Sequence, residues 1–164
     1  MPRSLLTLCA LLATAGYGAA QANVRIEPSH LEGPRALQQQ TADAAIRDYL
    51  EAWQSMGVAL GQNRAASLDA DFVGTARTEL AGTIQEQAAL GIRTRYQDRS
   101  HDIQIVFYSP EGLSIELTDT VEYDVQIFDH DKPQAAQRVR ARYLAILTPS
   151  EVSWRVRVLQ ANPE

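Results

Sequence analysis

The spacing of the apolar residues changes at Gly91, and this change limits the folds that the chain can adopt. Before Gly91, apolar residues recur every three or four positions, which is typical of one face of an α-helix. After Gly91 they recur at every second position to the end of the chain, which is typical of one face of a β-strand. The sequence therefore predicts an α+β domain in which N-terminal helices pack against a four-stranded antiparallel sheet.

Two clear helices and a shorter one are predicted in the first half. Thr41 suits the N-cap of the first helix, whose apolar residues continue at helical spacing to Gly61. The segment AASLDADFV predicts the short helix. The second clear helix begins near Thr75 and ends at Gly91, because glycine readily adopts the left-handed conformation that ends many helices.

Strands are predicted over residues 95–108, 113–127, 138–147 and 153–160. The sequence SPEG suits a tight hairpin turn between the first two strands. This turn predicts three cross-strand pairs: Phe107 with Ile115, Ile105 with Leu117, and Ile103 with Asp119. The strand residues expected to face the helices are Ile103, Ile105, Phe107, Ile115, Leu117, Val121, Tyr143, Val156 and Val158, with Trp53, Leu80 and Ile84 packed against them.

Asp119 interrupts the apolar face of the second strand, LSIELTDTVEYDVQI. A carboxylate that points into a core costs several kcal/mol if it has no partner. The segment TDT could mark a bulge that turns Asp119 to water or to a backbone amide. Asp119 could instead pair with His101, a diagonal neighbour in the same inward phase, either as a structural pair or as a general acid/base pair. We favour the bulge, because polar interruptions in long bent strands often mark one.

The outward phases of the strands carry opposite charges. The arginines of the third and fourth strands are Arg138, Arg140, Arg142, Arg155 and Arg157. A hairpin centred near residues 131–132 sets Glu122 against Arg142 and Asp124 against Arg140. We therefore interpret this face as a solvated, salt-bridged surface and not as a site for an anionic ligand.

Residues 1–22 have the features of a secretory signal peptide. Arg3 precedes an apolar run over residues 5–15, and the small-residue motif AQA ends at Ala22. The run is shorter than the roughly 20 apolar residues that a membrane span needs. We therefore predict cleavage after Ala22, no membrane span in the processed chain, and an exported protein, periplasmic or extracellular. Residues 23–40 are then a flexible leader, and residues 41–164 are a single domain.

Composition and motifs exclude several classes of function. The sole cysteine, Cys9, belongs to the predicted signal peptide, so the processed chain has no thiol nucleophile and no thiolate metal site. The formal net charge of −5 disfavours nucleic acid as a partner. Asp129, His130 and Asp131 are adjacent, but neighbouring turn residues diverge, so we predict neither a metal site nor a cofactor. His30 lies in the leader and has no predicted partner.

The order of the predicted elements resembles the nuclear transport factor 2-like superfamily, a cone-shaped α+β fold whose curved sheet wraps around its longest helix. The resemblance covers residues 41–160 and rests on three segments: AIRDYLEAWQSMG as the opening helix, ASLDADFV as the short helix, and SWRVRVLQ as the closing strand. It implies that a site, where there is one, lies inside the cone. The ketosteroid-isomerase-like and polyketide-cyclase-like relatives use inward Asp and His residues there.

This resemblance, together with the lack of a catalytic motif, leads to the expected function. We expect an exported, non-catalytic domain that binds a small apolar molecule in its cone, through Trp53, Tyr123 and Tyr143, or docks an envelope protein. The sheet also offers a surface for a homodimer. The alternative is an isomerase, dehydratase or cyclase that acts on a small organic substrate through Asp119 and His101. A filled interior favours docking, and a pocket that contains both side chains favours the enzyme.

Overall fold

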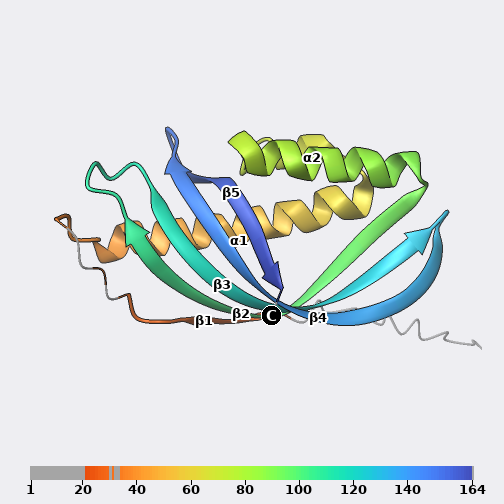
Figure 1. Cartoon of the computed structure of the whole chain (residues 1–164), viewed down its shortest axis with the longest axis horizontal. Helices are drawn as coiled ribbons and strands as arrows, with labels where there is room; N and C mark the ends of the chain where they lie inside the picture. Colours follow the sequence, from red (N-terminus) through yellow and green to blue (C-terminus); the bar gives the residue numbers. More distant parts are fainter. Residues whose placement is uncertain (1–20, 30, 32–33, 164) are drawn as a thin grey trace, which may run out of the picture.

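The computed structural model describes residues 21–29, 31 and 34–163, which form helices packed along a curved sheet (Figure 1). The predicted signal peptide as far as residue 20, and His30, lie outside the described residues. Within those residues, no helix is both long and apolar enough to cross a membrane.

The helical half contains the three predicted elements: α1 (Gln39–Gln62), the short 3₁₀ helix η1 (Ala65–Leu68) and α2 (Gly74–Ala89). The prediction that Thr41 is the N-cap is wrong, because the backbone N–H of Thr41 already bonds to the carbonyl of Gln38. At the other end of α1, Asn63 and not Gly61 takes the left-handed conformation. Gly91 has a φ of 70°, as its position after α2 predicts.

The sheet has five strands in the order β1-β2-β3-β4-β5. The four predicted strands are antiparallel: β2 (Ile92–Tyr108), β3 (Ile115–Asp129), β4 (Lys132–Pro149) and β5 (Trp154–Pro163). Three of them are longer than expected, and β3 has the expected length but lies two residues further along the chain. The additional strand, β1 (Asn23–Ile26), pairs in parallel with β2 and lies within the predicted leader. Its four residues are all exposed, so no apolar period could have predicted it.

The first hairpin follows the predicted register except near its turn. Ile105 lies opposite Leu117, as predicted. A register shift after Ile105 then places Phe107 opposite Glu116 and turns its side chain outward, with 47% exposed. The prediction that Phe107 faces the helices is therefore wrong, because an extra residue in one strand exchanges its two faces.

The second hairpin turns at His130 and Asp131, whose φ angles of 46° and 65° suit a two-residue turn of type I′. This turn is centred about one residue earlier than expected, so both predicted ion pairs are wrong by two positions. The observed pairs are Glu122 with Arg140, at 3.0 Å between Oε1 and Nη1, and Asp124 with Arg138, at 3.3 Å between Oδ1 and Nε. The outer face is salt-bridged, as predicted.

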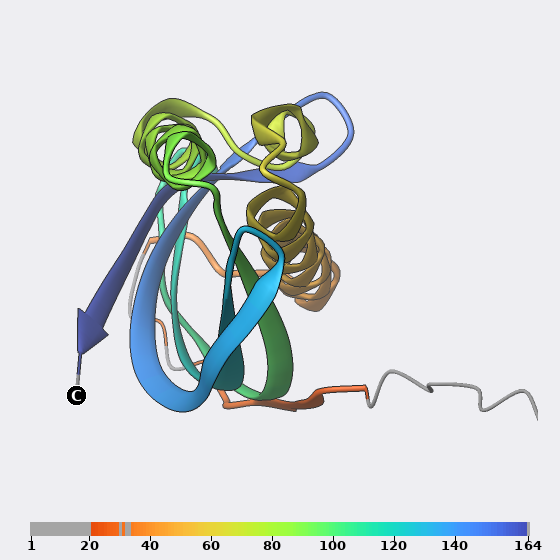
Figure 2. The same ribbon diagram turned by 90° about the vertical axis from the view of Figure 1, so that its right-hand side faces the viewer.

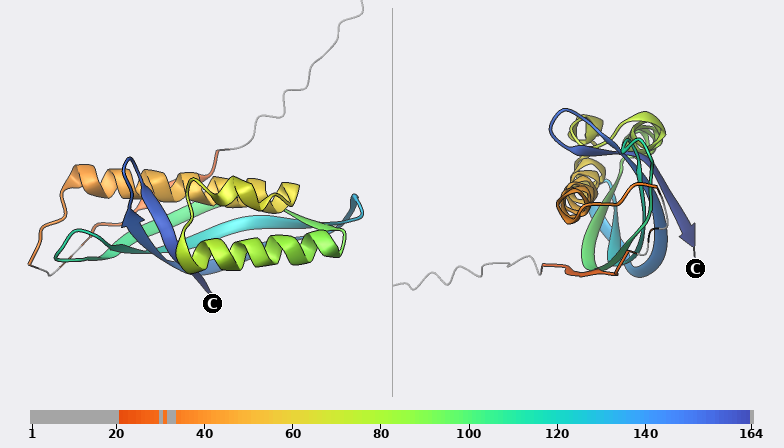
Figure 3. Two further views of the ribbon diagram at one scale, coloured as in Figure 1. Left: turned by 90° about the horizontal axis from the view of Figure 1, so that it is seen from above. Right: turned by 90° about the vertical axis from the view of Figure 1, so that its left-hand side faces the viewer.

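The core lies between α1 and the concave face of the sheet, which curves around that helix (Figure 2). Seen from above, α1 and α2 both run along the long axis of the sheet (Figure 3). Most of the predicted core is buried, including Trp53, Ile84 and Leu117. Val158 is an exception, since a register shift between β4 and β5 brings Leu159 against the core instead.

Candidate functional site

Asp119 lies on β3 with its side chain fully buried. Its pairing with Ile103 on β2 and with Tyr143 on β4 continues without a register shift, and the shifts of both pairings lie elsewhere along the strands. The prediction of a bulge that turns Asp119 to water is therefore wrong. The period of two holds through this residue, so its carboxylate needs partners inside the domain.

Two side chains hold the Asp119 carboxylate. His101 Nδ1 lies 2.7 Å from Asp119 Oδ2, and the hydroxyl of Tyr49 donates a hydrogen bond to the same oxygen at 3.0 Å. The other oxygen, Oδ1, is also buried and accepts no hydrogen bond from the described residues. His101 and Asp119 are therefore in contact, as the alternative to the bulge predicted, and Tyr49 connects this pair to α1.

Asp98 extends this network toward the surface. One of its oxygens, Oδ2, lies 4.0 Å from His101 Nε2, and the other accepts a hydrogen bond of 2.8 Å from Trp53 Nε1. Burial of His101 alone would lower the pKa of its imidazole, but the hydrogen bond to Asp119, together with the charges of Asp119 and Asp98, raises that pKa to about 9. The imidazole is therefore charged at neutral pH and lies between two carboxylates.

Aromatic rings enclose the network. The ring of Trp53 packs on His101 with centroids 5.4 Å apart and on Tyr143 with centroids 4.9 Å apart. The hydroxyls of Tyr123 and Tyr143 lie 3.1 Å apart. Burial raises the pKa of Tyr49 and of Tyr143 above the usual value, so both hydroxyls stay protonated. The result is that His101 is only 2% exposed and Asp119 is 0% exposed.

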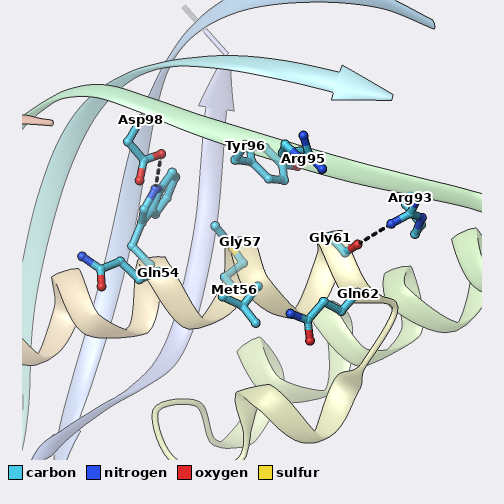
Figure 4. Close-up of a pocket in the computed structure, with 11 residues that line it drawn as sticks. Gln54, Met56, Gly57, Gly61, Gln62, Arg93, Arg95, Tyr96 and Asp98 are labelled. Atoms are coloured by element: carbon cyan, nitrogen blue, oxygen red, sulfur yellow. Dashed lines mark hydrogen bonds between the residues drawn. The ribbon is translucent and has the colours of Figure 1, made fainter. Parts of the chain in front are cut away.

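An open cleft of about 450 Å³ lies beside this network, between the C-terminal half of α1 and the start of β2 (Figure 4). Gly57 and Gly61 line it from α1, and Tyr96 lines it from β2. A Cβ atom at Gly57 would meet nothing within 4 Å, so the absence of a side chain leaves open space in the cleft. Trp53 and Asp98 belong both to this cleft and to the buried network, but His101 and Asp119 do not line it.

The network brings Asp98, His101 and Asp119 close together, but it does not place His101 or Asp119 against a molecule in the cleft. Both side chains lie behind Trp53, and a general acid or base must come within hydrogen-bonding reach of the group it serves. Tyr123 and Tyr143, two of the three predicted ligand contacts, likewise do not line the cleft. Trp53 does.

The turn residues Asp129, His130 and Asp131 do not converge. His130 Nδ1 lies 2.5 Å from Asp129 Oδ1, whereas Asp131 forms an ion pair with Arg93 on β2. Among the described residues, no group of three or more His, Cys, Asp or Glu side chains is placed to hold a metal ion.

Three residues of the site, Tyr49, Tyr96 and Asp98, were not predicted from the sequence. Tyr49 lies one helical turn before Trp53 on the same apolar face, so that spacing could have identified it. Asp98 was hidden by the register shift between Asp98 and Ser100, which changes the inward phase of β2 from even to odd residue numbers.

Neither a protein-family model nor a curated protein matches the sequence. Solved structures do match. The intermembrane space region of the chloroplast protein ARC6 superposes with a TM-score of 0.65 at 16% identity, over 79% of this chain and 100% of that one. A Novosphingobium aromaticivorans protein assigned as a scytalone dehydratase gives 0.53 at 14% identity, over 76% and 89%. A Streptomyces avermitilis protein assigned to the dehydratases of the nuclear transport factor 2-like family gives 0.50 at 11% identity, over 74% and 98%. The chain therefore has the nuclear transport factor 2-like fold, as its sequence predicted.

Proposed function

We propose that this chain, a domain of the nuclear transport factor 2-like fold, is a non-catalytic binding domain that docks a segment of another protein in the cleft between α1 and β2. One observation carries the proposal. The acidic and basic groups of the interior are sealed behind Trp53, whereas the cleft beside them is open and formed partly by the missing side chain of Gly57.

The packing of the interior argues against a small apolar ligand inside the cone. Such a ligand needs a concave space lined by apolar side chains. Around the expected contacts that space is occupied by the rings of Trp53, Tyr123 and Tyr143, which pack against one another. A filled interior is the outcome that favours docking over binding within the cone.

An exported location belongs to the same proposal. It rests on the signal-peptide features of residues 1–22. The similarity to a region of ARC6 that lies in an intermembrane space supports it at the level of fold.

A second candidate function is acid/base chemistry on a small organic substrate. The observation that favours it is the chain of contacts from Asp98, at the cleft, through His101 to Asp119. In such an enzyme, Asp98 is the group that touches the substrate. His101 and Asp119 would act only through it, as positioning residues.

The experiment is native mass spectrometry of the protein purified from its own cell envelope, compared with two glycine variants. Gly57→Leu fills the cleft, and Gly82→Leu makes the same change on α2, where a Cβ atom also meets nothing within 4 Å. We expect a bound polypeptide on the wild type and on Gly82→Leu, and its loss from Gly57→Leu. A bound small molecule, or a polypeptide that Gly57→Leu retains, would contradict the proposal.

A folded His101→Gln variant separates the two candidate functions. A docking domain keeps its polypeptide in this variant, because His101 does not line the cleft. A small bound molecule that both Gly57→Leu and His101→Gln lose would instead support acid/base chemistry, because Asp98 and Gly57 line the same cleft.

A further inference from the structure

We propose that the segment docked in the cleft is an extended, acidic strand that adds to the free edge of β2 at residues 95–98. The inference rests on the proposed docking function and specifies its partner. It follows from three features of the described residues: an unpaired strand edge, a notch at Gly57, and an arginine that forms no ion pair with the described carboxylates.

The edge of β2 is only partly covered. On one side β2 pairs with β3 along almost its whole length, but on the other side β1 pairs only with residues 100–103. Near the start of β2, the side chain of Asn63 bonds to the carbonyl of Ile92. Between these two covered stretches, no described strand pairs with this side of β2. A row of unpaired backbone groups is a template for another strand.

The backbone of this stretch faces the cleft. Because the Ile92 carbonyl bonds to Asn63, it points away from β3, and in an antiparallel pair the backbone groups alternate in direction from one residue to the next. The polar groups of Thr94, Tyr96 and Asp98 therefore point to the free edge. The carbonyl oxygen of Thr94 lies 3.7 Å from the Cβ position of Gly61, so α1 covers the edge at this residue and the stretch open to a partner begins at Arg95.

The space along this edge is long enough for a short peptide. The cleft continues into a second hollow of about 530 Å³, which shares Arg95, Tyr96 and Asp98 and extends to Ala22. Four residues of strand edge correspond to roughly 13 Å. If cleavage occurs after Ala22, as predicted, the exported chain lacks this residue and the hollow is more open.

The two faces of the edge differ in chemistry. On one face, the guanidinium groups of Arg93 and Arg95 lie over the ring of Phe128, at 5.6 Å and 4.9 Å from its centroid. Arg93 pairs with Asp131, but none of the described carboxylates pairs with Arg95. On the other face, the ring of Tyr96 packs on Tyr123 inside the domain.

The chemistry of these two faces predicts the order of side chains along the bound strand. Its side chains must alternate between them, since successive residues of a strand point to opposite faces. A carboxylate beside Arg95 gains a cross-strand ion pair, and an apolar side chain on the other face enters the notch at Gly57. The partner therefore carries acidic and apolar residues in alternation, even though this chain itself has a net charge of −5.

The test selects short random peptides displayed on phage against the exported protein, after peptides that bind the Gly57→Leu protein have been removed. We expect enriched peptides to alternate acidic and apolar residues. A synthetic peptide of the enriched sequence should bind Arg95→Glu at least about tenfold more weakly, because like charges then meet across the interface. Arg142→Glu, the same charge change on the outer face of β4, should leave binding unchanged.

Amide hydrogen exchange tests the strand addition itself. The bound peptide should slow exchange at Tyr96, whose amide points to the free edge, and should leave the amides of α2 unchanged. Enriched peptides that bind Arg95→Glu normally, or that leave Tyr96 unprotected, would overturn the acidic strand but not the docking function. If no peptide distinguishes wild type from Gly57→Leu, both proposals are wrong.

Discussion

The two faces of β3 carry the same kind of side chain in opposite physical settings. Asp119 points inward, is fully buried, and contacts His101 across the sheet. Asp124 points outward, keeps a quarter of its side chain exposed, and pairs with Arg99 and Arg138. Both carboxylates contact a cationic side chain of β2, His101 for Asp119 and Arg99 for Asp124, so solvent is the main difference between these two contacts.

That difference decides what each pair contributes. Water screens the outer ion pairs and solvates each partner when the other is removed. Exposed ion pairs therefore contribute little to the free energy of unfolding. Inside the domain, removal of one partner leaves a charge without water or counter-charge, which is strongly destabilising. The inward carboxylate therefore makes the fold depend on His101, whereas the outward one does not make it depend on Arg138.

The largest effect is expected for His101→Leu. It leaves the Asp119 carboxylate buried with only the Tyr49 hydroxyl as a partner, so we expect the free energy of unfolding to fall by about 3 to 5 kcal/mol. Chemical denaturation measures this loss. Combination with Asp119→Leu should recover part of the loss, with a coupling energy of about 1 to 3 kcal/mol between the two positions. A coupling below about 0.5 kcal/mol would show that the contact carries no stability.

The pH dependence of stability is the next effect. The pKa of His101 is about 9 in the folded protein, above its ordinary value of 6.5, so folding favours the protonated imidazole. This contribution is complete below pH 6.5 and is lost as the pH rises through 9. From the size of the shift we expect the free energy of unfolding to fall by about 3 kcal/mol across this range.

Denaturation midpoints between pH 6 and pH 10 measure this dependence, with His101→Gln as the control. The variant should lose the part of the slope that the wild type shows between the two pKa values. A wild-type slope that persists in the variant would assign the titration to other groups.

Most of the fold could be predicted from the sequence because the regular spacing of its apolar residues continues over many positions. The even spacing from Ile103 to Ile105 and from Leu117 to Val121 is enough to assign strands and their inner face. The wrong predictions cluster where one strand carries an extra residue, as at Phe107 and Val158. A bulge leaves composition and local period almost unchanged but exchanges the two faces beyond it.

The candidate site was harder to predict because it depends on contacts between distant segments. The hairpin register did place His101 near Asp119. No local pattern favoured that contact over a bulge, because the third member, Tyr49, comes from α1 at a separation of 70 residues. The cleft depends on Gly57, where the informative feature is the absence of a side chain.

A smaller effect distinguishes the cleft from the packed interior. Gly57→Ala should raise the free energy of unfolding by about 0.4 to 1 kcal/mol, because alanine restricts the unfolded chain and its methyl group meets nothing in the cleft. Gly82→Ala on α2 should behave in the same way. Thermal or chemical denaturation compares the two. Destabilisation by Gly57→Ala alone would show that the cleft is closed in solution.

The smallest effect is expected on the outer face, and it completes the comparison between the two carboxylates. Arg138→Ala removes one of the two arginines beside Asp124, but that arginine is 62% exposed and Arg99 remains in contact with the carboxylate. Water replaces the lost contact, so the denaturation midpoint should not change measurably at physiological salt. If Arg138→Ala instead destabilises the protein as strongly as His101→Leu, burial is not what separates the two faces of β3. The interior network would then need another explanation for its effect on stability.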